Sequence, residues 1–212
     1  MRTEDLIEAI ARDAAAPRPW LGGRMALALL AGGAVSYALY AVELGVRLDI
    51  LSVLFTWRFL LKIAVVTLLV VAACWASARL ARPDMKSRNV TGALAAAPAI
   101  LAMGVGYELL TLPAVQWPTY AIGTNAVLCL ISLPLLSVAP LLAMLAALRS
   151  GAPRSATAAG AVAGLLAGGM GATLYGTHCF DDSPLFVAIW YSIAIGLVVL
   201  AGAILGRYLL RW

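Results

Sequence analysis

Residues 124–148 read TNAVLCLISLPLLSVAPLLAMLAAL and contain no charged side chain. A helix needs about 20 mostly apolar residues to cross the hydrocarbon core of a bilayer, so this stretch is long enough to span a membrane. Pro134 and Pro140 lie within it and should bend the helix. The unbroken apolar run differs from the ~10-residue alternating pattern of membrane β-barrel strands. The stretch therefore predicts a transmembrane helix and an all-α fold.

The composition of the whole chain supports this interpretation. Of 212 residues, 63% are hydrophobic and 12% are charged, and the mean hydropathy is +0.96, whereas an ordinary soluble domain is about 45–50% apolar and about 25% charged. A single soluble core of this size could not hide that excess from water, and three cysteines are too few for a secreted disulfide scaffold. Six spans are predicted between the charged interruptions, at residues 24–45, 52–78, 91–110, 124–148, 157–176 and 185–206.

The basic residues predict the orientation. Twelve of the fifteen lysines and arginines fall on one side of the predicted membrane, and these are Arg2, Arg12, Arg18, Arg24, Arg79, Arg82, Lys86, Arg88, Arg149, Arg154, Arg207 and Arg211. The loops of the other side carry only Arg47. Under the positive-inside rule both termini are cytoplasmic. The net charge of +5 therefore reflects membrane topology, and we expect no direct nucleic-acid binding. No cleavable signal peptide is visible before the first apolar run.

Residues 1–20 are predicted to form a cytoplasmic tail, and residues 21–212 the six-helix transmembrane domain. The tail should be a short amphipathic helix with an apolar stripe of Leu6, Ile7 and Ile10 beside the acidic residues Glu4, Asp5 and Glu8. A helix that lies on the inner leaflet usually carries basic residues instead. The acidic composition therefore favours docking onto a basic protein partner, with lipid contact as the alternative.

Two cysteines are candidates for a site on the outer side. Cys129 lies near the outer end of the fourth span, and Cys179 follows His178 in the loop after the fifth span. Neighbouring antiparallel spans could bring the two sulfurs together, either as a disulfide or as part of a soft-metal site. His178 could raise the thiolate character of Cys179 or supply a nitrogen ligand. A metal would also need water or a carboxylate such as Asp181 or Asp182. The alternative is two unrelated thiols and a loop histidine. Cys74 is expected to be a buried, inert thiol.

Charged residues inside or at the ends of the spans form a second candidate cluster. Arg58 and Lys62 share one helix face, and Lys62 should lie ~13 Å deep if its span starts near residue 53. Charges within the membrane are functional candidates that usually have partners. Glu43 and Glu108 end the first and third spans on the same side, and we expect Glu108 to pair with Lys62, whereas Arg58 is expected to reach the interface alone.

Several local patterns predict structure rather than chemistry. Glycine or alanine recurs every four residues along residues 160–176, which permits close helix packing. Ser183 and Pro184 fit the cap and first position of a helix. The chain has no phosphate-binding glycine loop, no H-E-x-x-H, no G-x-S-x-G and no C-x-x-C motif. We therefore expect neither an enzyme nor a cofactor.

Taken together, these features resemble the NrsF-type membrane anti-sigma factors. The resemblance rests on the acidic tail with Thr3-Glu4-Asp5-Leu6-Ile7, the six spans, Cys129 and Cys179, and the stretch from His178 to Phe186 that leads into Trp190-Tyr191. It implies an inner-membrane protein that sequesters an extracytoplasmic-function sigma factor and releases it under heavy-metal or oxidative stress. It also implies that two cysteines contribute to sensing, and these correspond to Cys129 and Cys179.

The alternative hypothesis is a small transporter of an ion or solute. Lys62, Glu108 and the bent fourth span would then line its path. A transporter should need no soluble partner, so the two hypotheses differ in their dependence on the tail.

Overall fold

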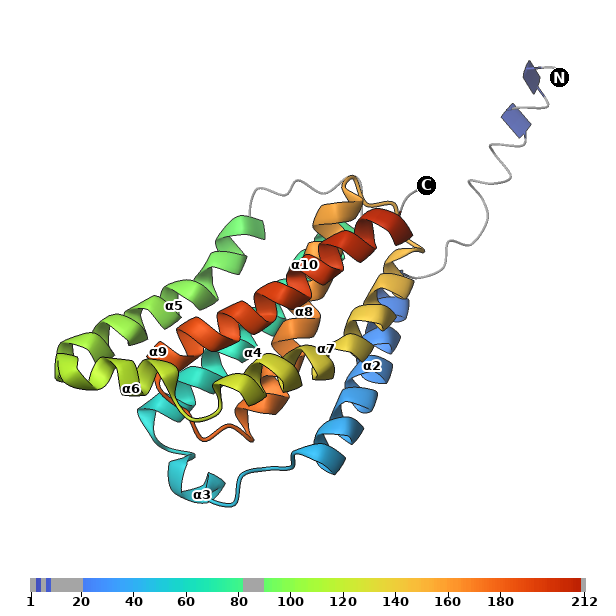
Figure 1. Ribbon diagram of the computed structural model, residues 1–212. Helices are drawn as coiled ribbons and strands as arrows, with labels where there is room; N and C mark the ends of the chain where they lie inside the picture. The colour runs from blue at the N-terminus through green and yellow to red at the C-terminus, as the bar shows by residue number, and fades with distance from the viewer. Residues whose placement is uncertain (1–2, 5–6, 9–20, 82–89, 211–212) are drawn as a thin grey trace.

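The computed structural model describes residues 3–4, 7–8, 21–81 and 90–210, and every regular element in those ranges is helical (Figure 1). The elements are α2 (Leu21–Glu43), α3 (Ile50–Val53), α4 (Trp57–Leu80), α5 (Val90–Thr111), the 3-10 turn η2 (Ala114–Gln116), α6 (Trp117–Ile122), α7 (Ala126–Leu148), α8 (Ala156–Gly176), α9 (Pro184–Phe186), the π-helical turn η3 (Val187–Tyr191) and α10 (Ser192–Leu209).

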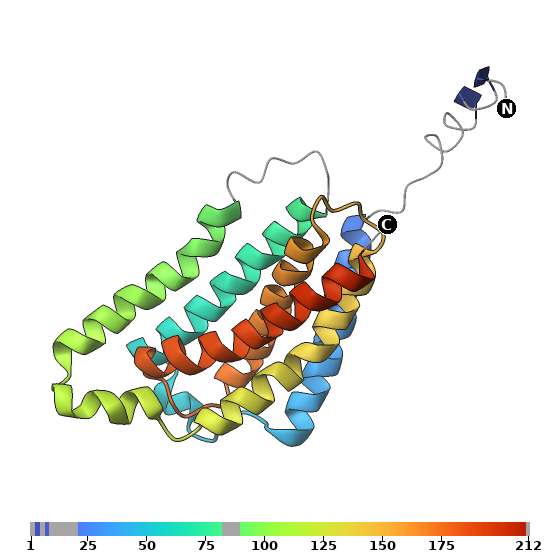
Figure 2. The same cartoon turned by 45° about the horizontal axis from the view of Figure 1, so that its top comes forward.

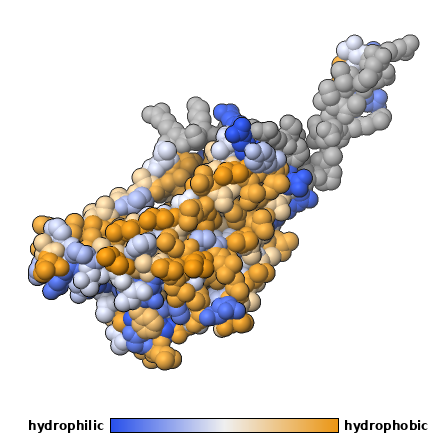
Figure 3. Space-filling model, viewed as in Figure 1, coloured by the Kyte–Doolittle hydropathy of each residue, from blue (hydrophilic) through white to orange (hydrophobic). Residues whose placement is uncertain are grey.

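Six of the helical segments are long and apolar enough to cross a membrane, which confirms the predicted number of spans. Four of them lie within a few residues of the predicted bounds, and the fourth span, Ala114–Leu148, begins earlier than predicted because it includes η2 and α6 before α7. The second was placed too early, because residues 50–53 form the separate helix α3 and α4 begins at Trp57. Large apolar side chains cover the sides of the bundle, as the space-filling view shows (Figure 3). That surface suits a hydrocarbon solvent.

Helix α8 lies in the middle of the bundle and packs against α4, α7 and α10, while α2 packs on α7 and α5 on α4 at the flanks (Figure 1). Its glycines allow backbones to approach closely. A Cβ at Gly160 would lie 2.2 Å from the carbonyl oxygen of Gly202, and one at Gly164 would lie 2.5 Å from that of Val198. The predicted role of the small residues in helix packing is therefore confirmed.

The bundle has two distinct ends. We call the end formed by residues 44–56, 112–125 and 177–183 the network end, and the end formed by Leu21, Ala81, Val90, residues 149–155 and Leu210 the terminal end. Helix α2 begins at the terminal end and helix α10 ends there (Figure 2). Which end faces the cytoplasm stays a prediction.

Only part of the predicted tail helix falls within the described residues. Thr3, Glu4, Ile7 and Glu8 are helical and exposed, and the side chain of Ile7 is 62% exposed. Three residues of the predicted partner-binding set lie outside the described residues, and these are Asp5, Leu6 and Ile10. Their role stays a prediction.

Candidate sensing site at the network end

Loop 177–183 follows α8. Its first residues contact α2 and the segment that follows α2. The hydroxyl of Tyr40 donates to Thr177 Oγ1 at 2.6 Å, because the Thr177 hydroxyl proton is directed to the carbonyl of Leu174. His178 Nδ1 lies 3.0 Å from the carbonyl oxygen of Gly45. A carbonyl only accepts hydrogen bonds, so Nδ1 carries the proton. These contacts fix the start of the loop against the first span.

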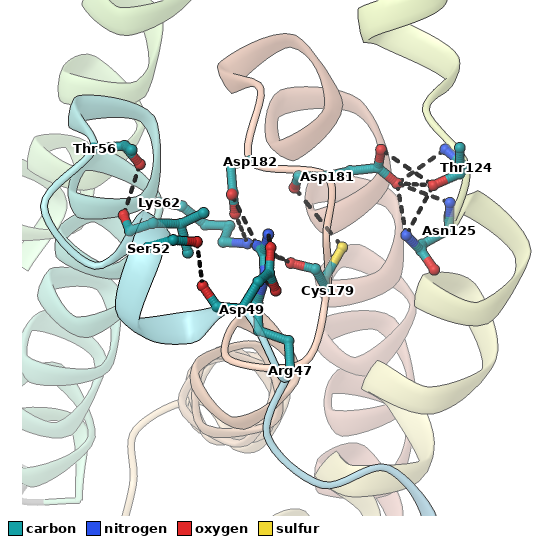
Figure 4. A network of polar contacts seen from close by, with 11 residues as sticks. Arg47, Asp49, Ser52, Thr56, Lys62, Thr124, Asn125, Cys179, Asp181 and Asp182 are labelled. Atoms are coloured by element: carbon teal, nitrogen blue, oxygen red, sulfur yellow. Dashed lines mark hydrogen bonds and ion pairs between the residues drawn. The ribbon is translucent and has the colours of Figure 1, made fainter.

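The centre of the loop binds two buried cations. The carboxylate of Asp182 accepts Lys62 Nζ on one oxygen and Arg47 Nη1 on the other, the latter at 2.9 Å (Figure 4). The same two cations donate to the carbonyl oxygen of Cys179, at 3.0 Å from Lys62 and 3.1 Å from Arg47. The side chains of Lys62 and Arg47 are 0% and 4% exposed. Lys62 therefore joins α4 to the loop through a matched, buried ion pair.

Arg47 is oriented by a second carboxylate and by an aromatic ring. Its Nε and Nη2 contact the two oxygens of Asp49 at 2.7 and 2.8 Å, and its guanidinium lies 4.7 Å from the ring centre of Phe180. The hydrogen bond from Arg47 lowers the pKa of Asp49 below its ordinary value, and the bond to Asp49 raises that of Arg47. This bidentate geometry keeps Arg47 beneath the loop.

Asp181 attaches the loop to the start of α7. Its Oδ2 accepts the backbone N–H groups of Thr124 at 2.9 Å and Asn125 at 2.8 Å, and the Asn125 side-chain amide at 3.0 Å (Figure 4). Backbone N–H groups at a helix start have no partner within the helix, and the helix dipole favours a negative charge there. Asp181 therefore caps α7 from another part of the chain.

The end of the loop is attached to α5. Ser183 Oγ donates to Glu108 Oε2 at 2.5 Å, and the same oxygen accepts the backbone N–H of Leu185 at 3.2 Å. Ser183 also accepts from Leu185, and Pro184 occupies the first turn, so the predicted helix start at Ser183-Pro184 is confirmed. The other oxygen of Glu108 lies 2.9 Å from Arg58 Nε without the alignment of a hydrogen bond.

The expected pairing of the membrane charges was wrong. Lys62 pairs with Asp182 rather than Glu108, and Glu108 pairs with Arg58, which therefore does not reach the interface alone. Glu43 is exposed and makes no ion pair within the described ranges. The reason is that loop 177–183 folds over the ends of α4 and α5 and inserts Asp182 beside Lys62. Because α4 begins at Trp57, Lys62 lies only ~8 Å from its first residue.

Cys129 and Cys179, at the network end, are both buried in one hydrophobic cluster. Cys129, in the first turn of α7, and Cys179 each have 0% exposure, and both are free thiols. The Cys179 thiol donates to the carbonyl oxygen of Asp181 at 3.7 Å. Burial raises the pKa of Cys179, while nearby Lys62 opposes that effect. The structure thus brings the two cysteines into one cluster, and their sensing role stays a prediction.

The sensing role expected of His178 stays a prediction. Its ring is held by the carbonyl of Gly45 and lies near the rings of Tyr175 and Phe180, with centroids 6.1 and 6.5 Å away. Within the part of the chain that the structure describes, no group of three or more His, Cys, Asp or Glu side chains is arranged to hold a metal ion.

A cavity of about 500 Å³ lies at the network end. Phe180, Asp181, Asp182 and Ser183 of the loop line it together with Arg58 and others. Small molecules can therefore approach the loop at this end, whereas both thiols are buried.

Some known proteins are similar to this chain in sequence. Residues 10–212 match the family model described as NrsF, negative regulator of sigma F. The chain belongs to the NrsF family. It is 35% identical over 221 residues to the anti-sigma-F factor NrsF of Caulobacter vibrioides (strain NA1000 / CB15N), and 32% identical over 213 residues to the probable anti-sigma-F factor NrsF of Azospira oryzae (strain ATCC BAA-33 / DSM 13638 / PS). Both alignments cover 100% of each chain, and no solved structure matches.

Membership of the NrsF family makes this chain one of a group of anti-sigma factors, which are regulators rather than catalysts. The family match begins at Ile10, so Leu6 and Ile7 precede it. Sequence reasoning missed several residues of the network end, of which Arg47 is the clearest. In the sequence, Arg47 is the only basic residue in the loops predicted to lie on the outer side. That position could have identified it as a candidate site residue.

Proposed function

We propose that this chain is an inner-membrane anti-sigma factor whose terminal end faces the cytoplasm. Its tail sequesters an extracytoplasmic-function sigma factor through the apolar stripe that contains Ile7. Membership of the NrsF family supports the anti-sigma role. The orientation is supported by four exposed arginines at the terminal end, Arg24, Arg149, Arg154 and Arg207, because basic residues favour the cytoplasmic side.

We further propose that heavy-metal or oxidative stress is sensed by Cys129 and Cys179. The observation that carries this proposal is the attachment of loop 177–183. In order along the loop, Thr177 contacts α2, Cys179 and Asp182 contact Lys62 of α4, Asp181 contacts the start of α7, and Ser183 contacts α5. Because the Cys179 side chain has no exposed surface, a group added to its sulfur must displace the loop or a neighbouring helix.

A route from the site to the tail passes through α7. Asp181 holds the first residues of α7, and beyond the other end of that helix Ser150 accepts a hydrogen bond from Arg24 at the start of α2. The tail directly precedes α2. A shift of α7 along this route would change the position of α2 and of the tail. Helix α7 would then be the element with two arrangements that long-range coupling requires.

Co-purification tests the sigma-binding part of the proposal. The full chain should retain a sigma factor on an affinity column, and a variant that lacks residues 1–16 should not. Ile7→Asp should also abolish retention, because it places a charge on the apolar stripe, while Thr3→Ala serves as an exposed control in the same tail. Retention by the truncated chain at equal expression would contradict the proposal and revive the transporter hypothesis.

A reporter of sigma activity tests the sensing part. The double variant Cys129→Ser, Cys179→Ser should stay repressed under cadmium or peroxide stress, whereas wild type induces. Cys74→Ser is the matched control, because Cys74 lies in the other half of the bundle, and it should induce normally. Induction of the double variant at the wild-type level would show that sensing lies elsewhere.

The transporter hypothesis has lost its main support. It relied on Lys62 as a charge deep in the membrane, and Lys62 instead lies near the start of α4, paired with Asp182.

A further inference from the structure

The hydroxyl of Tyr191 is buried and has no hydrogen-bond partner. Tyr191 is 2% exposed and ends the π-helical turn η3 at the start of the sixth span. A buried hydroxyl without a partner is destabilising and calls for an explanation, and π-helical turns occur often at functional sites. Two independent features thus single out the same residue.

Tyr191 belongs to the cluster that contains both outer-side cysteines. Its ring lies 5.9 Å from that of Tyr175 and 6.3 Å from that of Phe186. Its hydroxyl interacts electrostatically with the sulfurs of both Cys179 and Cys129 and lies within reach of a hydrogen bond to Cys179, although no partner meets hydrogen-bond geometry in the resting structure. A free proton donor therefore lies beside the two thiols.

Tyr175 lies in the same cluster and provides a contrast. It is also fully buried, but its hydroxyl donates to the carbonyl oxygen of Asn125 at 3.3 Å. A phenol has only one proton to donate. Tyr175 also lies within reach of the Cys179 sulfur, but its proton is already directed to the Asn125 carbonyl. In contrast, no partner holds the proton of Tyr191.

The thiol of Cys179 becomes such an acceptor when it loses its proton. In the resting state its S–H group donates to Asp181, so the sulfur does not need a donor. A thiolate lacks that proton and requires hydrogen bonds from its surroundings, because a buried charge is unfavourable unless it is paired. Lys62 is nearby, but its ammonium group already contacts Asp182 and the Cys179 carbonyl.

We propose that Tyr191 is the positioning residue of the sensor, and that its hydroxyl donates a hydrogen bond to the sulfur of Cys179 when that thiol ionises. This inference rests on the proposed sensing function of Cys179. The thiol proton leaves to a solvent base, the S–H contact to Asp181 is lost, and the Tyr191 O–H turns to the sulfur. The thiolate then attacks its electrophile. With iodoacetamide as the probe, an S–C bond forms, the C–I bond breaks and iodide leaves.

Several other charged or titratable groups lie around Cys179. Those that interact with its thiol are Lys62 from α4, Cys129 from α7, Tyr175 from α8 and Asp181 from the loop. Arg47 from the segment after α2 contacts the Cys179 carbonyl and Asp182, and His178 lies in the same loop. The Tyr191→Phe substitution leaves all of them in place, so it isolates the contribution of one hydroxyl group.

The experiment measures the alkylation rate of each cysteine in the full chain, in detergent micelles, with mass spectrometry to separate Cys179 from the other two. For Tyr191→Phe we expect the midpoint of the pH–rate profile of Cys179 to rise by about one pH unit. Below that midpoint the rate should fall about tenfold, the size expected for one hydrogen bond to a charged group. The melting temperature should stay the same or rise, because the variant removes an unpartnered polar group.

Tyr40→Phe is the matched control, because Tyr40 is buried in the same cluster and its hydroxyl donates to Thr177 of the same loop. It removes a hydroxyl that has a partner in the resting state and is not among the groups that act on Cys179, so it should lower the melting temperature and leave the pH midpoint of Cys179 unchanged. An unchanged midpoint in Tyr191→Phe, or an equal shift in both variants, would overturn the inference. These rates are measured without a sigma factor, so they are independent of the proposed regulatory function. If the cysteines prove dispensable in the reporter assay, that function fails separately.

Discussion

The two ends of this bundle use charge in opposite ways. At the network end Arg47 and Lys62 are buried, and each has carboxylate partners. At the terminal end Arg24, Arg149, Arg154 and Arg207 are exposed, and neighbouring segments are joined by contacts such as the backbone hydrogen bond from Ala152 to Ala81 at 3.3 Å. The same six helices thus end in a buried ion network on one side and in solvated basic residues on the other.

This difference separates two roles that charge plays in a membrane protein. Exposed arginines help to set the orientation in the bilayer and tolerate substitution, because water can solvate them. Buried ion pairs tolerate the loss of one partner poorly, since the other is left as an uncompensated charge. We therefore expect the network end to hold the helices together through specific pairs, and the terminal end to do so through close packing.

The largest effect is expected for Asp182→Ala. It leaves Lys62 without its carboxylate and Arg47 with only Asp49, so the free energy of unfolding should fall by about 3–5 kcal/mol. Reversible unfolding in mixed micelles measures this change. Arg149→Ala, at the exposed end, is the control and should change stability by less than about 1 kcal/mol. Equal effects of the two substitutions would remove the distinction between the ends.

The next effect is expected for Gly164→Leu, which tests packing. A Cβ at Gly164 already comes within 2.5 Å of the Val198 carbonyl oxygen, so a larger side chain must push α8 and α10 apart at a cost of about 1–3 kcal/mol. Gly196→Ala is the control, because nothing lies within 4 Å of its added methyl group. The melting temperature of that control should not fall. A Gly164→Leu protein as stable as wild type would mean that close backbone approach contributes little.

A smaller effect is expected for Glu108→Gln. The amide keeps an acceptor oxygen for Ser183 and Leu185 but loses the charge that pairs with Arg58, whose side chain is 28% exposed. Water can partly replace the lost carboxylate, so we expect a loss of about 1 kcal/mol in thermal unfolding experiments. A loss as large as that of Asp182→Ala would mean that Arg58 depends on its partner as strongly as Lys62 does.

The smallest effect concerns pH and Asp49. Because Arg47 lowers the pKa of Asp49 in the folded protein, ionised Asp49 stabilises the fold above the ordinary aspartate pKa of about 3.9, and that contribution is lost as the pH falls through the lowered value. The stability difference between wild type and Asp49→Asn should therefore be present at neutral pH and shrink in acid. A difference that stays constant from pH 7 to pH 3 would exclude this linkage.

The fold was largely predictable, and the pairing within the site was not. The bounds of α5, α7 and α8 differ from the predicted spans by at most two residues, because the hydropathy of a span depends only on its own residues. The start of the helix at Ser183-Pro184 is equally local. The partner of Lys62 could not be obtained in this way, because five acidic residues lie at that end of the bundle, and the sequence does not show which of them folds against Lys62.

The sequence by itself determined that this chain has six membrane spans with small-residue packing along the fifth, and that it resembles the NrsF family. Each of these follows from the order of residue types along the chain. Only the tertiary structure decided that Lys62 pairs with Asp182 and Glu108 with Arg58, that Asp181 caps α7, and that Tyr191 lies beside the thiols. Those choices depend on how loop 177–183 crosses the ends of the helices, and that path is set by packing among residues far apart in the sequence.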